Sequence, residues 1–491
     1  MSNEARDFVA AAMQLLQRGE PRSALNAATA GLNKFPDHAG LSALLGTINL
    51  HLGHLLPAQL LLEKALELGP PTAPVVYHLG VIADQRGHAD EAVRHYEYAS
   101  TLDESHYPSL LNLGNLLAAA ENWSEARALF HRVFSITEDP RIHKNLGVSA
   151  LEHNDLESAH HHFQAALDAF PKWHEVKLNL AFVLLKQGAF KDGWGLYEAR
   201  FEAEANRHSY SSSLQKWEFE PDRSVLIWTE QGVGDTIMYM SQLAEIAGRC
   251  SAVAVVAEQR LHSLLRRSFG TRIHYYDRTS ELPDQLDFDS QLSIESCPQF
   301  FRTNTESFNG SKRPYLKPDP HLVARFREQF TREGSGKPIL GLSWRSNNPE
   351  VGLRRSIHFC DLLAVLPEDA LHLVNLQYGD VSSELSEARE KQFTMSHPDE
   401  ADYLIDLEAF AAAVAACDYV VTIDNSTAHF AGALGKSQTI LLPFVCDWRW
   451  GVKEETVWYQ DCFLIRQHSR GDWTDALVSM SGLVNSRLQL T

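Results

Sequence analysis

The spacing of hydrophobic and small residues divides the chain of 491 residues into two parts that meet near residue 203. In the first part, small residues, glycine and proline recur at intervals that suit pairs of short helices joined by tight turns. In the second part, short apolar runs alternate with segments of helical spacing, which is typical of α/β domains. The pattern therefore predicts a helical part followed by an α/β part.

The first part is built from an internal repeat. A small residue recurs in steps of 34, with one step of 33, at Ala12, Gly46, Gly80, Gly114, Gly147 and Ala181. Seven residues after these come Gly19, Gly53, Gly87, Glu121, Asn154 and Gly188, which are mostly predicted helix ends. A third set, which allows two helices to pack closely, is Ala24, Ala58, Ala92, Ala126, Ala159 and Gly193. The pattern resembles the tetratricopeptide repeat, a helix–turn–helix unit of about 34 residues, in six units.

Stacked units of this kind form a concave face that suits an extended peptide or a partner protein. We therefore expect a protein to bind there; the alternative is that the repeats only support the second part. The run His160, His161 and His162 suggests a metal site. Successive helical residues point in different directions, however, so a solvated helix face is the favoured interpretation.

The second part contains eight predicted strands, at residues 225–228, 252–257, 273–276, 290–294, 339–344, 371–376, 419–423 and 439–442. Their alternation with helices predicts two doubly wound α/β domains. A glycine- and proline-containing patch at residues 333–338 predicts a hinge between them. We expect repeats over residues 1–203, a linker over 204–220, and α/β domains over 221–336 and 337–491.

A glycine-rich turn follows the first of these strands. Gln231, Gly232 and Gly234 lead to Asp235, and the next residues have helical spacing. Glycine permits a tight turn and a close approach of backbone to a ligand. Asp235 either faces a substrate hydroxyl from this turn or caps the helix.

A second loop of the same kind follows the strand at 419–423. Asp424, Asn425, Ser426, Thr427 and His429 lead into a helix rich in small residues. Hydroxyls and free backbone N–H groups at a helix N-terminus suit a diphosphate. Alternatively, Ser426 and Thr427 only cap the helix and His429 packs in the core. Both loops follow the carboxyl ends of strands, where doubly wound sheets bind their ligands.

Overall composition excludes several classes of protein. The chain has 44 basic and 63 acidic residues, a formal charge of −19, which argues against nucleic acid as a partner. It has no run of 18 apolar residues, so we expect no membrane span. Residues 1–7 do not begin a secretory signal, and none of the six cysteines forms a Cys-x-x-Cys pair. These features favour a cytoplasmic protein.

The two loops, at residues 230–235 and 423–436, resemble the signature loops of the heptosyltransferase-like glycosyltransferases of family nine. They are most similar to the branch in which tetratricopeptide repeats precede the transferase, some bacterial members of which glycosylate proteins, flagellin included. Further matches lie at residues 192–200, 344–349, 354–357, 376–380, 442–450, 466–467 and 471–473. Asn347 and Asn425 depart from the usual glycine and the usual Thr or Ser, which puts the donor's identity in question rather than the activity.

The resemblance implies a GT-B architecture of two Rossmann-like domains. It also implies an inverting, metal-independent transfer of a sugar from a nucleotide-sugar donor, with no further cofactor. The protein acceptor, for example flagellin, would be presented by the repeats. The implied donor-binding residues are Trp344, Arg345, Arg354, Arg355, Gln377, Asp424, Asn425, Ser426, Thr427 and His429.

Asp235 is the expected general base, which takes the acceptor's proton as the acceptor attacks the anomeric carbon. Its alternative role is to hold the loop by hydrogen bonds. The leaving diphosphate would be neutralised by the helix dipole, by hydroxyls, and by Arg345 with Arg354 or Arg355.

Other side chains keep two interpretations each. Gln377 lies near the nucleotide base or packs, and His429 orients the phosphate loop, with His358 a weaker acid–base candidate. Residues 448–450 form either the acceptor side of a cleft or packing between domains. Asp287 and Asp289 have the spacing of a metal-binding pair but precede their strand, so we expect no metal site.

Two rival functions differ from this expectation. A repeat scaffold with a vestigial nucleotide-binding domain would have lost catalysis. A transferase for lipopolysaccharide sugars would leave six repeats without a task, and the sequence shows no basic amphipathic face for a membrane surface.

Overall fold

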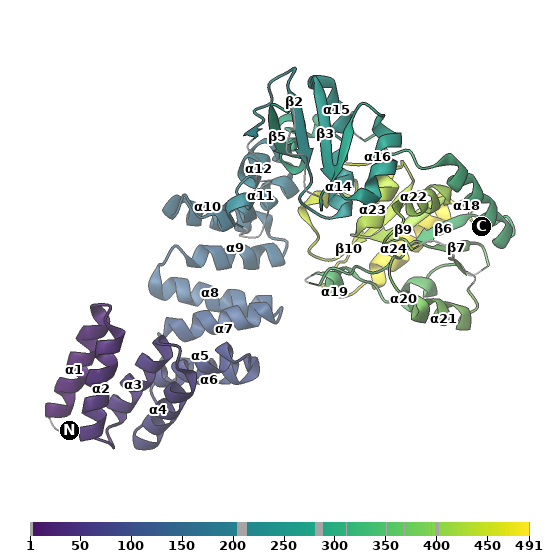
Figure 1. Ribbon diagram of the computed structural model, residues 1–491. Helices are drawn as coiled ribbons and strands as arrows, with labels where there is room; N and C mark the ends of the chain where they lie inside the picture. The colour runs from purple at the N-terminus through teal and green to yellow at the C-terminus, as the bar shows by residue number, and fades with distance from the viewer. Residues whose placement is uncertain are drawn as a thin grey trace. The chain divides into compact units, whose positions relative to one another are not determined.

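The computed structural model describes residues 3–203, 214–279, 288–310, 312–349, 351–367, 369–393, 395–397 and 402–490. The chain forms two compact units, Met1–Pro171 and Lys172–Thr491. The first is all helical, and the second carries two parallel β-sheets (Figure 1). The predicted order of a helical part and an α/β part is confirmed.

Ten helices form the first unit in antiparallel pairs. They are α1 (Asn3–Gln17), α2 (Pro21–Lys34), α3 (Ala39–His51), α4 (Leu55–Leu68), α5 (Ala73–Gln85), α6 (Ala89–Leu102), α7 (Tyr107–Ala119), α8 (Trp123–Thr137), α9 (Ile142–Glu152) and α10 (Leu156–Ala169). Each pair packs internally and against the next pair. The spacing of small residues therefore predicted the repeating unit.

Steric contact explains the period of small residues. A Cβ atom at Gly46, Gly80, Gly114 or Gly147 would lie 2.5–2.8 Å from the side chain sixteen residues later: Leu62, Tyr96, Phe130 and Phe163, respectively. Only glycine lets the paired helices approach this closely. The predicted turn positions have positive φ in all six repeats, including the non-glycine residues Glu121 (63°) and Asn154 (56°).

The sixth repeat packs with the α/β part. Its helices are α11 (His174–Gln187) and α12 (Phe190–Tyr197), followed by α13 (Arg200–Ala203). Lys186 Nζ donates to the carbonyl of Cys446 at 3.0 Å, and Trp194 Nε1 donates to the carbonyl of Arg302 at 2.8 Å. The boundary between the two compact units therefore lies between the fifth and the sixth repeat.

The first sheet has five parallel strands in the order β1-β5-β2-β3-β4. They are β1 (Gln215–Lys216), β2 (Ser224–Trp228), β3 (Ala252–Ala257), β4 (His274–Asp277) and β5 (Ser290–Ser293). Of the predicted linker, residues 204–213 lie outside the described part. Its other end belongs to the domain, because β1 pairs with β5 and Trp217 is fully buried.

The second sheet has six parallel strands in the order β11-β10-β9-β6-β7-β8. They are β6 (Ile339–Leu342), β7 (His372–Asn375), β8 (Met395–Ser396), β9 (Tyr419–Ile423), β10 (Gln438–Leu442) and β11 (Cys462–Arg466). Counted from β6, this is the doubly wound order 3-2-1-4-5-6, whose direction reverses between β6 and β9. In the first sheet, the corresponding reversal lies between β2 and β5.

The remaining helices lie between or after these strands. They are α14 (Val233–Met240), α15 (Leu243–Arg249), η1 (Gln259–Leu261), α16 (His262–Phe269), η2 (Ile294–Ser296), α17 (Pro298–Phe301), η3 (Thr305–Phe308), α18 (Pro320–Glu333), α19 (Gly352–Arg355), α20 (Phe359–Ala364), α21 (Ser382–Glu390), α22 (Leu407–Ala416), α23 (Ser426–Ala433), η4 (Trp448–Trp450) and α24 (Thr474–Arg487). Helix α18, which the sequence assigns to the first α/β domain, packs instead on α22 beside the second sheet.

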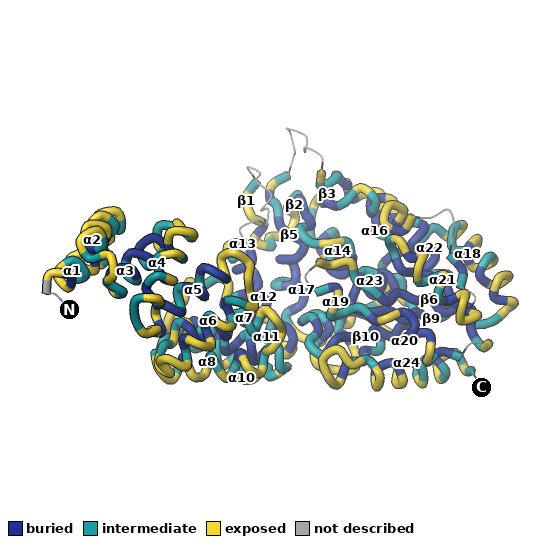
Figure 2. Tube along the Cα trace, turned by 90° about the horizontal axis from the view of Figure 1, so that it is seen from below, coloured by how far each residue is buried: buried dark blue, intermediate teal, exposed yellow. Residues whose placement is uncertain are grey.

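The two sheets share a continuous core. One cluster of buried residues runs from α11 and α12 through α14 to β9, β10 and α23. A second cluster covers the other face of the second sheet. Strands β6, β9 and β10 are buried along their whole length (Figure 2). On these three strands, a ligand could therefore reach only the residues that follow the strand ends.

Candidate functional site

The two glycine- and acid-containing loops meet through the helices that follow them. Helix α14 begins after Gly232, and α23 begins after Asn425. A Cβ atom at Gly234 would lie 2.9 Å from Cδ2 of His429 and 3.2 Å from Cα of Ser426. Glycine at this position therefore allows the first turns of the two helices to touch.

Asn425 ties the second loop to the reversal point of its sheet. Its Oδ1 accepts from the backbone N–H of Thr427 at 3.0 Å and so caps α23. Its Nδ2 donates to Ser343 Oγ at 2.8 Å, across from β9 to the end of β6. The Thr427 hydroxyl is buried without a hydrogen-bond partner among the described residues, and Ser426 is half-buried.

Arg449 joins the second domain to the first loop. Its Nε lies 2.7 Å from Asp235 Oδ1, an ion contact without the alignment of a hydrogen bond. Nη2 donates to Gln231 Oε1 at 2.7 Å, and Nη1 donates to Asp447 Oδ1 at 2.7 Å. Burial opposes the charge, but Asp235 and Asp447 raise the pKa of Arg449 well above its ordinary value. The side chain is therefore a fixed, buried cation.

Arg355 extends this network to the second loop. Its Nε lies 3.3 Å from Asp424 Oδ2, and its Nη2 lies 3.8 Å from Asp447 Oδ2. Burial raises the pKa of Asp424, and Arg355 offsets part of this effect. For Asp447, Arg449 and Arg355 together outweigh burial and lower the pKa. Two arginines thus share Asp447 between the two loops.

His429 is a buried, neutral side chain. Its Nδ1 lies 2.8 Å from the Tyr459 hydroxyl, and its ring stacks on Trp450 with centroids 5.2 Å apart. Burial, then the charge of Arg449, lowers the pKa of His429 to about 3. Trp450 and Trp448 are themselves buried, and with Arg449 they line a cavity beside α11.

Gln377, through Ser343, and Arg345 contact the second loop at the end of β6. Ser343 Oγ donates to Gln377 Oε1 at 3.2 Å and accepts from Asn425 Nδ2. The same Asn425 Nδ2 also donates to the carbonyl of Arg345 at 3.3 Å. Gln377 is buried and its Oε1 accepts from the backbone N–H groups of Trp344 and Arg345 at 3.0 and 2.9 Å. The Trp344 ring stacks on Phe359 at 4.1 Å inside the core. Arg345 pairs with Glu384 at 2.9 Å and donates to the carbonyl of Asp380. Arg354 is half-buried beside Arg355, and His358 is exposed.

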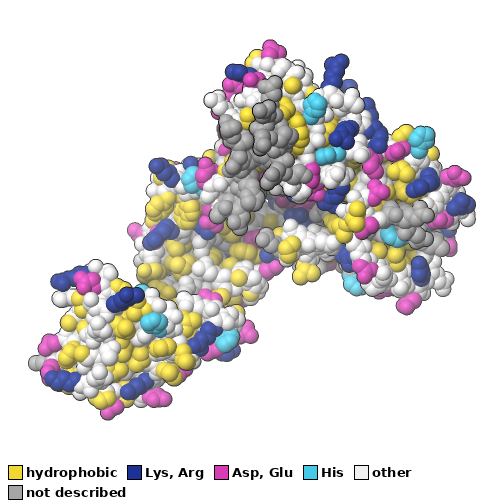
Figure 3. All heavy atoms as spheres, in the orientation of Figure 1, with side chains coloured by type: hydrophobic (Ala, Val, Ile, Leu, Met, Phe, Trp, Pro, Cys, Tyr) yellow, Lys and Arg dark blue, Asp and Glu magenta, His cyan; other side chains and the backbone are white. Residues whose placement is uncertain are grey.

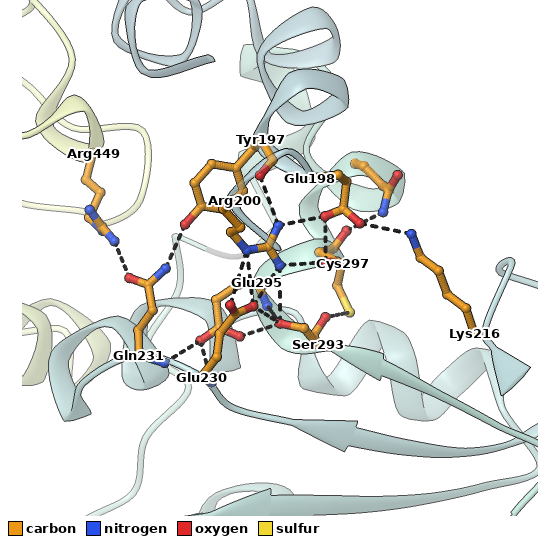
Figure 4. A network of polar contacts seen from close by, with 12 residues as sticks. Tyr197, Glu198, Arg200, Lys216, Glu230, Gln231, Ser293, Glu295, Cys297 and Arg449 are labelled. Atoms are coloured by element: carbon orange, nitrogen blue, oxygen red, sulfur yellow. Dashed lines mark hydrogen bonds and ion pairs between the residues drawn. The ribbon is translucent and has the colours of Figure 1, made fainter. Parts of the chain in front are cut away.

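A second polar network lies under the first loop (Figure 4). Arg200, fully buried, pairs with Glu230 and with Glu198, each at 2.7 Å. Glu295, in η2 directly after β5, accepts from the backbone N–H groups of Glu230 and Gln231 at 3.3 Å. Arg200, Glu230 and Glu295 are not among the site residues predicted from the sequence. The signal that could have revealed Glu230 and Glu295 is an acidic residue two positions after a strand, β2 or β5.

Neither a metal cluster nor a membrane span is found in the described part of the chain. No group of three or more His, Cys, Asp or Glu side chains is arranged there to hold a metal ion. Among the same residues, no helix combines the length and apolar character needed to cross a membrane. Asp287 lies outside the described residues.

Comparison with known proteins identifies the repeats. Residues 85–146 match one tetratricopeptide repeat family, and residues 9–73 and 144–203 match a second. Repeats of this kind are also seen in YrrB, "a TPR protein with an unusual peptide-binding site" (22% identity, 33% of this chain and 85% of YrrB, TM-score 0.29). A tetratricopeptide repeat protein from Parabacteroides merdae is 16% identical over 41% of this chain and 80% of its own (TM-score 0.34). The first part of the chain is a tetratricopeptide repeat array.

Two curated relatives are similar to parts of the chain. Protein FlbA of Caulobacter vibrioides is 30% identical over 314 residues, which are 60% of this chain and 52% of FlbA. The chain thus spans about half the length of this relative, and the match is too long to be confined to the repeats. A probable biofilm formation methyltransferase, WspC of Pseudomonas putida, is 39% identical over 70 residues, 14% of this chain and 16% of WspC.

Proposed function

We propose that this chain is a glycosyltransferase that moves a sugar from a nucleotide-sugar donor to a protein acceptor. The observation that carries the proposal is the meeting of two loops from two parallel sheets. Asp235 and the Asp424 loop belong to one network through Arg449, Asp447 and Arg355. Each loop follows a strand at the point where the order of its sheet reverses, the usual place for a ligand in this kind of fold.

The donor is proposed to bind at the start of α23. The first turn of this helix offers backbone N–H groups and the Thr427 hydroxyl, and Arg355 lies beside it. Helix N-termini and arginine both favour phosphate oxygens. These groups suit the diphosphate of a nucleotide sugar and would stabilise the charge that develops on it as it leaves.

Asp235 is the proposed general base. Its side chain keeps 27% of its surface exposed despite the contact with Arg449. In the proposed step, an acceptor oxygen or nitrogen forms a bond to the anomeric carbon while the bond from that carbon to the diphosphate breaks. The acceptor's proton passes to the Asp235 carboxylate, and the nucleoside diphosphate leaves.

The repeat array is the proposed binding surface for the protein acceptor. Tetratricopeptide stacks present a concave face that accommodates extended peptides. Over the visible face of α1–α4, hydrophobic side chains lie among charges of both signs (Figure 3). Recognition there would rest on shape and mixed contacts rather than on one sign of charge.

The first test is a thermal-shift screen of the full chain against nucleotides and nucleotide sugars in the presence of EDTA. A ligand that binds the native state raises its stability by mass action. We expect a shift with one nucleotide series without added metal. A flat response to the whole panel would favour the rival function, a repeat scaffold with an inert α/β part.

The second test is Asp235→Asn. We expect transfer to fall by about 100-fold or more, while the donor still raises the melting temperature. The matched control is Asp418→Asn. Asp418 pairs with Arg327 at the same 2.7 Å and is similarly exposed, at 30%, but it precedes β9 at the opposite end of the strand. Loss of donor binding with preserved transfer in Asp235→Asn would exclude the base assignment.

A further inference from the structure

Gln231 is the residue on which three parts of the second unit converge (Figure 4). Its Nε2 donates to the Tyr197 hydroxyl of α12 at 2.6 Å. Its Oε1 accepts from Arg449 of the second α/β domain at 2.7 Å. Its backbone N–H donates to Glu295 at 3.3 Å, and its carbonyl accepts from Arg278 at 2.9 Å. Both ends of the side-chain amide are thus bonded.

The neighbouring Glu230 is held from the same helical segment. Arg200 of α13 contacts both carboxylate oxygens of Glu230, at 2.7–3.3 Å. Arg200 also donates to Ser296 at 2.7 Å and pairs with Glu198, which pairs with Lys216 at 2.9 Å. Tyr197 and Arg200 end the last repeat, so two successive loop residues are bound by the repeat array.

Polar contacts fix the turn between β2 and α14 ahead of Gly234, which packs on α23. A Cβ atom at Gly232 would meet nothing within 4 Å, so the turn is not wedged against neighbouring atoms there. The contacts of Glu230 and Gln231 therefore hold the turn that leads into α14, together with the packing of Gly234 on α23. Asp235 lies in the first turn of that helix and moves with it.

We propose that Tyr197 and Arg200 are positioning residues for Asp235, acting through Gln231 and Glu230. Their role rests on the proposed function, in which Asp235 is the base. The last repeat then serves two purposes: it ends the acceptor-binding array, and it sets the geometry of the loop that carries the base. Small displacements of a reacting group lower the rate of the chemical step far more than they affect binding of the other substrate.

The test is Tyr197→Phe in the full chain, which removes one hydroxyl and keeps the ring. The matched control is Tyr239→Phe, because the Tyr239 hydroxyl is also buried but makes no hydrogen bond to the described residues. Amide hydrogen exchange of residues 229–236 is measured by mass spectrometry without any substrate. We expect exchange about fivefold faster in Tyr197→Phe, the factor that one hydrogen bond provides, and unchanged exchange in Tyr239→Phe.

Transfer kinetics supply the second readout. We expect kcat of Tyr197→Phe to fall about tenfold, with the donor dissociation constant within about twofold of the parent. Arg200→Lys keeps the positive charge but loses the planar guanidinium group. We expect a larger fall in kcat than in Tyr197→Phe, again with little change in the donor dissociation constant. Because Arg200 is buried, Arg200→Lys is interpreted only if circular dichroism shows the native fold. If it does not, Tyr197→Phe alone tests the positioning role.

The outcomes separate the two proposals. Unchanged loop exchange in Tyr197→Phe, or equal acceleration in Tyr239→Phe, overturns the positioning role whether or not the chain transfers sugar. Accelerated exchange with an equal loss of donor binding and turnover also overturns it, because the tyrosine would then support the whole site. Absence of transfer by the parent chain with any donor rejects the proposed function, and the exchange result still shows what holds the loop.

Discussion

At the scale of single residues, Glu295 illustrates how burial changes the chemistry of a carboxylate. It is fully buried in η2, where Oε1 accepts two backbone N–H groups and Oε2 accepts from Ser293 Oγ at 2.7 Å. Burial, then the charge of Glu230, raises the pKa of Glu295 from 4.5 to about 7. Near neutral pH, this side chain is therefore only partly ionised.

Glu295→Gln should stabilise the protein at pH 8 and much less at pH 5. Between pH 4.5 and 7, the folded state keeps a proton that the unfolded state has released, so stability falls as pH rises through this window. Gln is neutral at every pH and avoids this loss, which amounts to at most about 3 kcal/mol. The measurement is the free energy of unfolding by denaturant at both pH values, with exposed Glu306→Gln as control. A gain of the same size at pH 5 and pH 8 contradicts the prediction.

The candidate residues that the structure brings together are those whose position follows from local rules. Asp424 directly follows a buried strand, Asp235 follows a glycine-rich turn after another, and strand ends meet at one sheet edge. Arg449 was noticed only as part of an amphipathic cluster, since its partner Gln231 lies 218 residues away. Trp344 and Gln377 also follow strands, but the structure uses the Trp344 ring and the Gln377 amide for packing and backbone contacts. Adjacency to a strand end locates a residue without telling which way its side chain points.

At the scale of elements, the approach of α14 to α23 creates the candidate site. The contact depends on Gly234, since a side chain there would meet both His429 and the backbone of Ser426. His429 cannot easily move aside, because it is buried between Trp450 and Tyr459. The spacing of the two loops is therefore set by a single missing Cβ atom.

Gly234→Ala should lower the free energy of unfolding by about 1–3 kcal/mol, the usual cost of forcing an extra methyl into a packed contact. Gly248→Ala is the matched control: Gly248 also lies in a helix, α15, but its Cβ would meet nothing within 4 Å. There the higher helix propensity of alanine should stabilise by up to about 1 kcal/mol. Denaturant unfolding of both variants measures the difference, and equal changes would show that α14 and α23 do not touch as described.

The limits of element prediction also have physical causes. The eight predicted strands lie near the observed bounds of β2–β7, β9 and β10, because a continuous apolar run has few alternative folds. Strand β11 was not predicted; its burial is interrupted, with Phe463, Ile465 and Arg466 only half-buried. Strands β1 and β8 have two residues each, too few to show any pattern. Helix α18 was placed in the first domain because the glycine patch after it suggested a hinge. Its buried Phe326 and Phe330 face the second domain instead, a partnership that spacing alone does not reveal.

At the scale of the whole molecule, half-buried histidines of the repeat unit and buried groups of the α/β unit respond differently to acid. In the repeats, His143 and His162 place their Nδ1 atoms 2.9 Å apart, so only one proton fits between them. Burial, then the neighbouring His143, His161, His131 and Arg127, lowers the pKa of His162 to about 4. Burial, then His51 and His106, has the same effect on His78. In the α/β unit, the lowered pKa of His429 makes stability fall as pH drops, whereas the raised pKa of Glu295 makes stability rise.

We expect the repeat unit to be the first to unfold on mild acidification. For His78 and His162, the unfolded state binds protons below pH 6.5 that the folded state takes up only near pH 4, so stability falls as pH drops through this window. Because His162 is partly exposed, it contributes less to this loss of stability than a fully buried histidine would. Calorimetry at pH 7 and pH 5 should show the repeat transition moving down by several degrees, at about 2–4 °C per kcal/mol for a unit of this size. The α/β transition should move less, because Glu295 gains stability over the same interval.

The variant His162→Gln assigns this effect to the cluster. Glutamine keeps a polar side chain but cannot take up a proton, so the downward shift between pH 7 and pH 5 should shrink. His88→Gln is the control, since the His88 side chain is 60% exposed on the same unit and the pH response should stay as in the parent. If His162→Gln and the parent shift equally, the half-buried pair does not govern the acid response. A single transition at both pH values would show instead that the two compact units unfold together, in which case stability at the histidine cluster is shared by the α/β part.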